Sequence, residues 1–597
     1  MKNYQKFLLS ILSGGLLAIA FPPSLLFPLA FFAFIPLLWI FEQENWNKRK
    51  YIWVYCTFFV YHSGMNWWIG SWQPHADQFL MISSIILAFV HPLFFFVPFF
   101  LYFFVKRRFG SVTALWLLPF FWTFNEWTRT LSDLAYPWLA IGYTQAYNKL
   151  WIQFIDITGI WGASFLIVLF NIILMIILLK SGKHSPVIPA HAEIHSGENS
   201  VILAHTGIHS DKNFVIPTHA GIPFLVNTVN AGNNNIKNPI SIYFNRQTYH
   251  LIISLLLIII IPLLYSYYPR SKYQAPDGKL VHFAVIQPNI NPWDKWERSI
   301  NEQINLQMRL EDSLIQAIAP FKPDFGLWSE TSLHYIGRSF NVDHNLSFIQ
   351  QWVNSNKVPL ISGFADFKLT YNKDSLSLTA KPFDPSGAVW YDAFNSSILI
   401  PIDSSAQAKY QIYHKMRLTP FSEQLPFKEV LSFARKWMEW GVGISSWAIG
   451  KEQFCLKAPV RGDTVSIGTI ICIESIFPSF CAGFVRSGAQ VLTVITNDAW
   501  YDNTPGPEQH YQIACMRAIE NRRYIVRCGN SGISGVISPL GETLSQATAQ
   551  KKIAYLGSAR TMDGQTFFVR FGDWLPHFSL ILTILVLIYG KVKRRTV

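Results

Sequence analysis

Three short stretches of the sequence contain residue types that could carry out nucleophilic chemistry. The run TIICIES places Cys472 at the end of an apolar segment, with Glu474 two residues later. PDFGLWSETS places Glu330 after another apolar segment, and YHKMRLTPFSEQLP places Lys415 and Glu423 in a proline-containing loop. A thiol reacts well only as a thiolate and needs a nearby base or cation. Lys415 could stabilise a developing oxyanion, and Glu330 could move the proton.

Each of these residues has a simpler interpretation when it is taken alone. A lone buried cysteine is more often part of a core than a nucleophile, and a Glu or Lys in a loop is usually solvated. All three residues lie near the ends of predicted strands, however, which is where chemistry gathers in open α/β sheets. Their combination in this order therefore favours a catalytic site.

The segment that must position these residues runs from about Lys279 to Trp574, where short apolar runs alternate with helical patterns. Six runs have the composition of strands: VHFAVIQPN, VPLISGFADF, FNSSILIPID, VSIGTIICIE, QVLTVITNDAW and RYIVRCGNSGISGVIS. ERSINEQINLQMRLEDSLIQAI and PEQHYQIACMRAIENRR have apolar residues near helical spacing. The alternation predicts an α/β domain of about 300 residues, large enough for its own core.

The remainder of the chain has the composition of a membrane protein. Of 597 residues, 50% are hydrophobic, 16% are aromatic and 14% are charged, whereas soluble chains have about 25% charged residues. A helix needs roughly 20 apolar residues to span the hydrocarbon core. We predict eight such spans, at about 6–22, 24–42, 51–71, 79–105, 111–129, 151–179, 249–267 and 575–590.

The distribution of basic residues predicts how these spans are oriented. Basic residues flank alternate ends of the spans, which is typical of cytoplasmic loops. We therefore expect cytoplasmic termini and place the α/β domain outside. The net charge of +13 is then largely a topology signal, and no nucleic acid partner is needed to explain it. The residues concerned are Lys2, Lys6, Lys48, Arg49, Lys50, Lys106, Arg107, Arg108, Lys180, Lys183, Lys591, Lys593, Arg594 and Arg595.

Residues 181–247 contain a short repeat between the sixth and seventh predicted spans. VIPAHAEIHSG, VILAHTGIHSD and VIPTHAGIPF recur with a period of fourteen residues and carry His191, His205 and His219. A metal site is one interpretation. Three short copies rich in Pro, Gly and Asn are more typical of a disordered insertion, here cytoplasmic, and we assign it no function. The six cysteines have no metal-like spacing either, so we expect no metal and no cofactor.

Several motifs give the chain a resemblance to a known family. The order Glu330, Lys415, Cys472 resembles the nitrilase-type carbon–nitrogen hydrolases. More narrowly, the chain resembles the apolipoprotein N-acyltransferases, the membrane-embedded branch, in six motifs: QPNINPWDKW, WSETS, YHKMRLTPFSEQLPF, CIES, TNDAWYDNTPGPEQH and MRAIENRRYIVRCGNSGISGVISPLG. NEWTRTLSDLAYPWLAIGYTQ and TFFVRFGDWLPH extend the resemblance to the flanks. The 181–247 insertion is not part of it.

The resemblance implies a fold and a domain layout. The catalytic domain would be a nitrilase-like four-layer α-β-β-α sandwich on an eight-helix transmembrane bundle. Helices one to six would occupy residues 1–180, helix seven 248–268, the extracytoplasmic catalytic domain 269–574, and helix eight with a basic tail 575–597. The location would be a bacterial inner membrane, with the catalytic domain on the periplasmic side.

The resemblance also implies roles for individual residues. Glu330 would be the general base, Lys415 the oxyanion-stabilising cation and Cys472 the nucleophile. Two further carboxylates, Glu423 and Glu474, would support them. Two tryptophans, Trp296 and Trp500, would bind substrate, although aromatic packing near the membrane explains them equally well. One residue departs from the family: Ile473 follows the nucleophile where a Tyr is usual.

The reaction implied by the resemblance is a two-step acyl transfer. A phospholipid, typically phosphatidylethanolamine, would acylate Cys472, and the N-terminal amine of an S-diacylglyceryl-cysteine apolipoprotein would then take the acyl chain. A membrane-anchored amidase shares the triad but leaves the spans unexplained. A transporter would show more ionisable residues within the spans than Glu126 and Arg129. A catalytically dead scaffold would not have all three triad positions filled.

Overall fold

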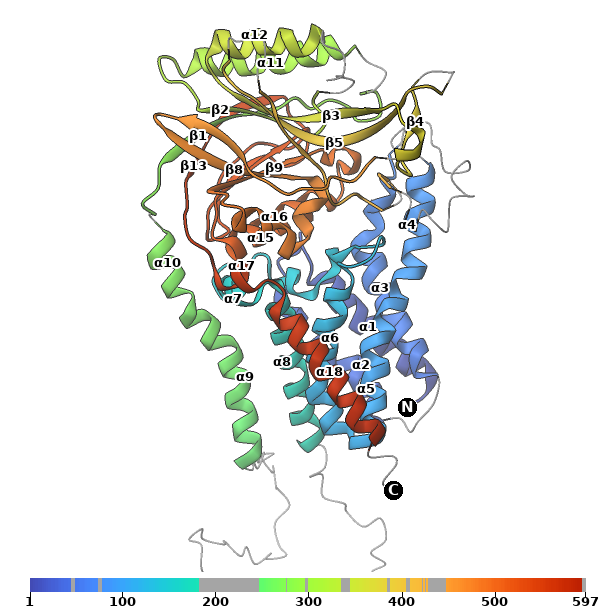
Figure 1. Ribbon diagram of the computed structural model, residues 1–597. Coiled ribbons are helices and arrows are strands. Elements are labelled where there is room, and N and C mark those ends of the chain that lie inside the picture. The colour runs from blue at the N-terminus through green and yellow to red at the C-terminus, as the bar shows by residue number, and fades with distance from the viewer. Residues whose placement is uncertain are drawn as a thin grey trace, which may run out of the picture.

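The computed structural model describes most of the chain and contains an α/β domain at one end of a group of long helices (Figure 1). The described residues are 1–43, 49–73, 78–181, 246–274, 276–295, 299–333, 344–383, 387–403, 409–420, 422–424, 426–427 and 447–592. The predicted insertion, apart from its ends, and Trp296 lie outside these residues.

The α/β domain contains two mixed sheets. One has the strand order β13-β1-β2-β3-β5-β4, with β6 also paired to β5, and the other has the order β12-β11-β10-β9-β8-β7. In each sheet three adjacent strands are parallel, β1-β2-β3 and β8-β9-β10, and antiparallel strands flank them. The bounds are β1 Leu280–Gln287, β2 Phe325–Trp328, β3 Leu360–Thr370, β4 Lys381–Pro382, β5 Trp390–Ile400, β6 Gln411–His414, β7 Leu456–Val460, β8 Asp463–Ile471, β9 Val491–Thr496, β10 Ile525–Gly529, β11 Gly535–Ile537, β12 Thr543–Gln546 and β13 Ile553–Arg560.

The two sheets pack face to face between two layers of helices. Strand β1 shows the alternation that this requires, because successive side chains of a strand point to opposite faces. Val281, Phe283 and Val285 join the core between the sheets, whereas Ala284 and Ile286 pack beneath α11 (Ile300–Ala317) and α12 (His344–Asn356). Helices α15 (Pro478–Arg486) and α16 (Gly506–Asn521) lie against the second sheet, on the side of the long helices (Figure 1). The domain is therefore an α/β sandwich with two sheets between two layers of helices, the architecture that the resemblance implies.

Helices occupy all eight predicted spans, but only some are long and apolar enough to cross a membrane. Among the described residues four helical segments meet that standard: Leu80–Phe109, Ile160–Ser181, Arg246–Tyr273 and Trp574–Val592. The remaining spans coincide with α1 (Asn3–Ile19), α2 (Ile35–Gln43), α3 (Lys50–Asn66) and α6 (Ser111–Thr128). The count of eight spans remains a prediction.

Several predicted elements are interrupted in the structure. The span at 24–42 consists of a 3₁₀ turn, η1 (Phe27–Phe31), followed by α2, and each element has a proline in its first turn, where a missing N–H costs nothing. The span at 151–179 begins with η6 (Trp151–Phe154) and α7 (Ile155–Thr158). Gly159, at φ +63°, then separates α7 from α8 (Ile160–Ser181). The run predicted as one strand after Arg523 is two strands, β10 and β11.

Buried polar contacts join the long helices to the α/β domain. The guanidinium of Arg522, at the end of α16, makes two hydrogen bonds of 2.9 and 2.8 Å to Asp156 in α7. Gln509 of α16 accepts hydrogen bonds from the indoles of Trp68 and Trp138. Because α16 also packs beneath the second sheet, these contacts fix the catalytic domain on the helices.

The ends of the long helices that are far from the sheets share one side of the molecule. The N-terminus, the C-terminal end of α8, the N-terminal end of α9 (Arg246–Tyr265) and the C-terminal end of α18 (Trp574–Val592) all lie there (Figure 1). Glu126 and Arg129 lie buried near the opposite end of α6, and Glu126 accepts hydrogen bonds of 2.8 Å from Trp122 and from the backbone of Ile141.

Candidate active site

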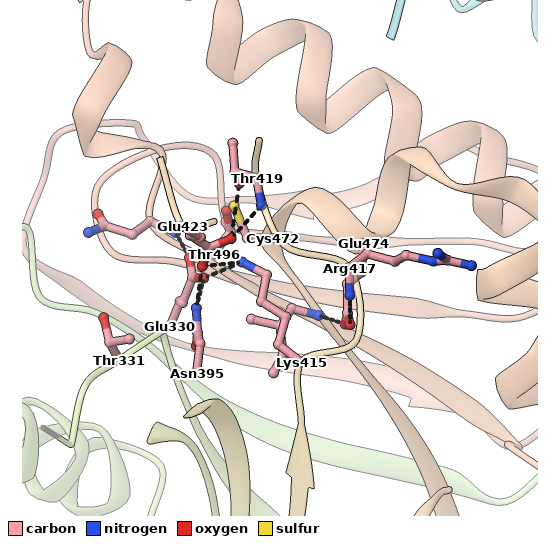
Figure 2. Close-up of polar contacts among 12 residues, drawn as sticks. Glu330, Thr331, Asn395, Lys415, Arg417, Thr419, Glu423, Cys472, Glu474 and Thr496 are labelled. Atoms are coloured by element: carbon pink, nitrogen blue, oxygen red, sulfur yellow. Dashed lines mark hydrogen bonds and ion pairs between the residues drawn. The ribbon is translucent and has the colours of Figure 1, made fainter. Parts of the chain in front are cut away.

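The structure brings together the three residues that the sequence predicted as a catalytic triad (Figure 2). Glu330 follows β2, Lys415 follows β6 and Cys472 follows β8, so that each residue lies just beyond the carboxyl end of a strand. The ammonium of Lys415 lies 3.0 Å from Glu330 Oε1 and 2.9 Å from Glu423 Oε1. All three of these charged side chains are buried.

Two asparagines and a threonine hold the carboxylates in place, and sequence reasoning missed all three. The amide of Asn395, in β5, donates to Glu330 at 2.8 Å and to Glu423 at 2.9 Å. The backbone N–H of Asn497 donates to the other oxygen of Glu330 at 3.1 Å. Thr419 donates to Glu423 from its backbone at 2.8 Å and from its hydroxyl at 3.0 Å. A polar residue within the apolar run FNSSILIPID was the available signal for Asn395.

The electrostatics of the site favour a charged Lys415 beside a neutral thiol. Burial alone would lower the pKa of Lys415, but the carboxylates of Glu330 and Glu423 outweigh it and raise that pKa above its usual range. Burial would raise the pKa of Glu423, and Lys415 outweighs that effect and lowers it. For Cys472, burial and the Glu330 carboxylate raise the thiol pKa, and Lys415 opposes them only in part. The resting thiol therefore needs a base before it can attack.

Cys472 has an unusual backbone conformation at the point where β8 ends. Its φ is +49°, in the left-handed region that non-glycine residues rarely occupy, and it begins the 3₁₀ turn η10 (Cys472–Ile476). The residue as a whole is partly exposed, whereas the other cysteines of the catalytic domain, Cys455, Cys481, Cys515 and Cys528, are buried. None of the six cysteines is bridged. The turn thus presents one thiol where a substrate could reach it.

Glu474 links the loop of the nucleophile to the loop of the lysine. One of its oxygens accepts hydrogen bonds from the Tyr413 hydroxyl at 2.6 Å and from the backbone of Met416 at 2.7 Å. The other accepts from the backbone of Ile471 at 2.9 Å. Burial raises the pKa of Glu474 to about 7 against the effect of these donors. The carboxylate thereby connects the residues beside Lys415 to the end of β8.

The backbone of the loop that carries Glu330 is in close contact with Lys295 on one side and Gly363 on the other. Thr331 has φ +49°, and Lys295, buried, donates to the Glu330 carbonyl at 3.2 Å and to the Thr331 hydroxyl at 2.8 Å. Burial lowers the pKa of Lys295 to about 8, although Glu330 opposes this effect. On the other side a Cβ at Gly363 would lie 2.3 Å from the backbone nitrogen of Thr331. Sequence reasoning missed both Lys295 and Gly363.

Of the two tryptophans predicted to bind substrate, the structure describes Trp500. It lies in η11 (Asp498–Tyr501), and its ring meets Trp293 edge to face at 4.9 Å. Its carbonyl accepts a hydrogen bond of 2.6 Å from Ser71, in the turn that follows α3 and η2 (Trp67–Gly70). Trp500 therefore lies where the catalytic domain meets the long helices. Within the described part of the chain, no group of three His, Cys, Asp or Glu side chains is placed to hold a metal.

Comparison with known proteins divides the chain into the same two parts, the long helices and the α/β domain. Residues 13–173 match the family described as apolipoprotein N-acyltransferase N-terminal domain, and residues 314–559 match carbon-nitrogen hydrolase. The apolipoprotein N-acyltransferase of Chlorobaculum tepidum is 29% identical over 99% of this chain and 97% of its own length. That of Geobacter metallireducens is 25% identical over 95% and 92%. Nit3 of Saccharomyces cerevisiae, a member of the nitrilase superfamily, covers 47% of this chain and 90% of its own at 13% identity, with a TM-score of 0.34.

The sandwich and the residues at its strand ends define a nitrilase-type carbon–nitrogen hydrolase domain, here joined to long apolar helices. The matches to both domains, and to relatives along nearly the whole chain, narrow this class further. The chain is thus similar to apolipoprotein N-acyltransferases along nearly its whole length, which confirms the resemblance drawn from the motifs.

Proposed function

We propose that this protein completes lipoprotein maturation by transferring an acyl chain from a phospholipid to an apolipoprotein. The donor is a glycerophospholipid, phosphatidylethanolamine in the first instance. The acceptor is the N-terminal α-amine of an S-diacylglyceryl-cysteine apolipoprotein. The transfer passes through a thioester on Cys472, so that the two substrates react one after the other.

The observation that carries this proposal is the position of Lys415 between the two carboxylates beside the Cys472 thiol. In the first step Cys472 Sγ attacks the ester carbonyl carbon while Glu330 takes the thiol proton. Lys415 stabilises the oxyanion of the tetrahedral intermediate. The ester C–O bond then breaks, Glu330 returns the proton to the departing alkoxide, and a lysophospholipid leaves.

The second step uses the same groups in the reverse direction. The α-amine of the acceptor attacks the thioester carbonyl, and Glu330 takes a proton from the nitrogen. Lys415 again stabilises the oxyanion. The C–S bond breaks, Glu330 returns the proton to the sulfur, and the amide product leaves with the thiol restored. Glu423 positions Lys415, and Glu474 positions the loop beside the thiol.

The long apolar helices suit a reaction between two lipid substrates. Both substrates are lipids, and a bilayer confines them to two dimensions beside the site, which raises their effective concentration. Four apolar helices and the contact of Trp500 with the turn after α3 support this location. We place the chain in a bacterial inner membrane with eight spans and with its catalytic domain, 269–574, on the periplasmic side. Trp500 and Trp296 would bind substrate there.

Orientation rests on two observations that agree. The basic residues cluster at one set of helix ends, as expected for cytoplasmic loops. The ends of α8, α9 and α18 that lie far from the sheets belong to this set (Figure 1). We therefore assign residues 1–180, 248–268 and 575–597 to the membrane part and its basic tail, and residues 181–247 to the cytoplasmic side.

The test is an assay with a defined acceptor. Purified enzyme is mixed with phosphatidylethanolamine and a synthetic diacylglyceryl-cysteine lipopeptide, and the lipopeptide is followed by mass spectrometry. We expect a gain of one fatty acyl group on the α-amine with wild type and none with Cys472→Ala. An Nα-acetylated lipopeptide is the matched control and should stay unmodified. Release of free fatty acid without lipopeptide acylation would contradict the proposal and favour a hydrolase.

A further inference from the structure

Tyr501, in the catalytic domain, has no part in the steps above, but its position relates it to the nucleophile. It ends η11 (Asp498–Tyr501), the 3₁₀ turn that follows β9. Because residues three apart in a 3₁₀ turn lie above one another, Tyr501 shares a face with Asp498. Asp498 lies 2.9 Å from His510 Nδ1, and His510 Nε2 lies 3.2 Å from the carbonyl oxygen of Cys472. That face of η11 is therefore directed toward the turn that carries the thiol.

The ring of Tyr501 is held in place, whereas its hydroxyl makes no hydrogen bond among the described residues. Trp68, in η2, meets the ring edge to face at 4.9 Å. Thr504 donates to the Tyr501 carbonyl from its hydroxyl at 2.6 Å and from its backbone at 3.2 Å. The ring also packs against the apolar cluster that contains Ile473, the residue after the nucleophile. Tyr501 is partly exposed, as is Cys472, so a substrate that reaches the thiol can also reach the phenol.

The Tyr501 hydroxyl keeps its proton at neutral pH. Burial raises the pKa of Tyr501, and the negative charges that Cys472, Asp498 and Glu423 can carry raise it further. Interactions between charges weaken with distance, so these effects also indicate that the hydroxyl lies near the thiol and near Glu423. A neutral phenol donates one hydrogen bond and can accept others. Tyr501 is therefore suited to bind a polar atom of the substrate, and not to act as a base.

The proposed reaction places two different atoms at one position beside the thiol. In the first step the alkoxide oxygen leaves the tetrahedral carbon, and in the second the α-amine nitrogen attacks along the reverse path. Glu330 moves the proton at this position, and Lys415 is engaged with the oxyanion. The departing oxygen is best stabilised by a donor, whereas the attacking amine needs an acceptor for an N–H. One hydroxyl can serve as both, because its O–H donates and its oxygen accepts.

We propose that Tyr501 is a catalytic residue that hydrogen-bonds the departing alkoxide oxygen in the first step and the attacking α-amine in the second. In the first step its O–H donates to the oxygen while the ester C–O bond breaks. In the second its oxygen accepts from an amine N–H while the C–N bond forms. Tyr501 keeps its own proton throughout, and Glu330 remains the group that gains and loses one. This inference rests on the proposed function, because it needs an acyl transfer through Cys472.

The test compares two acyl donors that differ in their leaving groups. Phosphatidylethanolamine releases a strongly basic alkoxide, whereas p-nitrophenyl palmitate releases p-nitrophenolate, a weak base that leaves without help from a hydrogen bond. For Tyr501→Phe we expect acylation of Cys472 by phosphatidylethanolamine to fall about 10- to 100-fold, the range for a hydrogen bond to a charged group. Acylation by p-nitrophenyl palmitate should stay within about threefold of wild type, because that reaction does not use the bond. Both rates are read from the intact mass of the protein.

The second step is tested on the acyl-enzyme made with p-nitrophenyl palmitate. The diacylglyceryl-cysteine lipopeptide is added, and its gain of an acyl group is followed by mass spectrometry. Tyr501→Phe should transfer about three- to tenfold more slowly, the range for a neutral hydrogen bond. Tyr511→Phe is the matched control: it removes a tyrosine hydroxyl that lies 2.9 Å from Thr543 in the same domain, and it should match wild type in all three rates. Since Tyr501→Phe keeps the ring, its rate with p-nitrophenyl palmitate also reports that the site is folded.

Three outcomes would overturn the inference. Tyr501→Phe that takes the acyl chain from phosphatidylethanolamine as fast as wild type would show that the departing oxygen does not need the phenol. Equal losses with the two donors would show that Tyr501 acts on the thiol, the carbonyl or the fold, and not on the leaving group. Normal transfer to the lipopeptide would remove its role in the second step. Wild type that is acylated by p-nitrophenyl palmitate but never by phosphatidylethanolamine would instead contradict the proposed function.

Discussion

The ammonium of Lys415 lies 2.9 Å from Glu423 Oε1, and both side chains are buried. A buried ammonium needs compensation by negative charge, and Glu423 supplies part of it together with Glu330. The arrangement keeps a positive charge beside Cys472 without contribution from solvent. It also makes the site sensitive to changes that keep the shape of a side chain and remove its charge.

Glu423→Gln tests this sensitivity. The glutamine fills the same volume but removes one of the two charges that stabilise Lys415. Lys415 and Thr419 both donate hydrogen bonds to the Glu423 carboxylate, so the amide NH₂ of the glutamine would face one of these donors where an acceptor is needed. We expect acylation of Cys472 to fall about 100-fold or more, measured as acyl-enzyme formation in a single turnover. Glu452→Gln, an exposed change in the same domain, is the control and should behave as wild type. Near-normal acylation by Glu423→Gln would contradict the role given to Glu423.

Glu330→Gln should separate the reactivity of the thiol from catalysis. Burial and the Glu330 carboxylate raise the pKa of Cys472, and Lys415 lowers it. Loss of the carboxylate removes one of the effects that raise this pKa, so thiolate forms at lower pH than in wild type. Iodoacetamide should then alkylate Cys472 faster at pH 7, by about tenfold for each unit of pKa lost, while acylation is abolished. The measurement is the alkylation rate at several pH values between about 6 and about 10, a range that includes the usual pKa of a thiol. A variant whose alkylation profile is unchanged or moves to higher pH would exclude this electrostatic account.

Gly363→Ala tests the close approach behind Glu330. The added Cβ would meet backbone atoms at 2.3 Å from Thr331, 2.4 Å from Ser329 and 2.6 Å from Glu330, so the loop itself must move. A displacement of about 1 Å at a catalytic group can cost about 100-fold in rate. We expect a loss of this size in kcat with little change in KM. Gly15→Ala, where the added Cβ meets nothing within 4 Å, is the control. Normal kcat in Gly363→Ala would show that the loop tolerates the shift.

The ion pair between Asp156 and Arg522 joins the long helices to the catalytic domain, and breaking it should cause a large loss of stability. Asp156→Ala leaves Arg522 as a buried, unpaired charge, which costs about 3–5 kcal/mol. The free energy of unfolding in detergent is the quantity to measure. The matched control is Glu542→Ala, whose partner Arg270 is 38% exposed and whose own side chain is 42% exposed. An exposed pair is worth about 0–1 kcal/mol. Equal losses in the two variants would contradict the account of this interface.

The alternation of strands and helices predicted an α/β domain, and the resemblance of the motifs implied that it is a sandwich. Glu330 and Cys472 were predicted because each follows an apolar run, and Lys415 because it lies in the loop after a predicted strand. The sequence alone could not reveal Asn395 or His510 in the same way. Asn395 lies within a strand and His510 within a helix that is buried on all sides, so periodicity does not distinguish them from core residues. Their partners lie 65 and 38 residues away along the chain, and only the fold brings them together.

The predicted spans illustrate a second limit. Hydropathy located all eight helical regions, since an apolar composition does not depend on the exact path of the backbone. It did not locate the breaks at Gly159 or between η1 and α2, because these depend on local backbone conformation and not on composition.

The central claim is that Cys472 carries the acyl group, and intact mass measures this most directly. Purified protein is incubated with phosphatidylethanolamine and no acceptor, alongside Cys472→Ala. We predict that wild type gains the mass of one fatty acyl group, that hydroxylamine removes it, and that Cys472→Ala gains nothing. An unmodified wild-type protein with intact lipid, or an acyl group that persists in Cys472→Ala, would contradict the account.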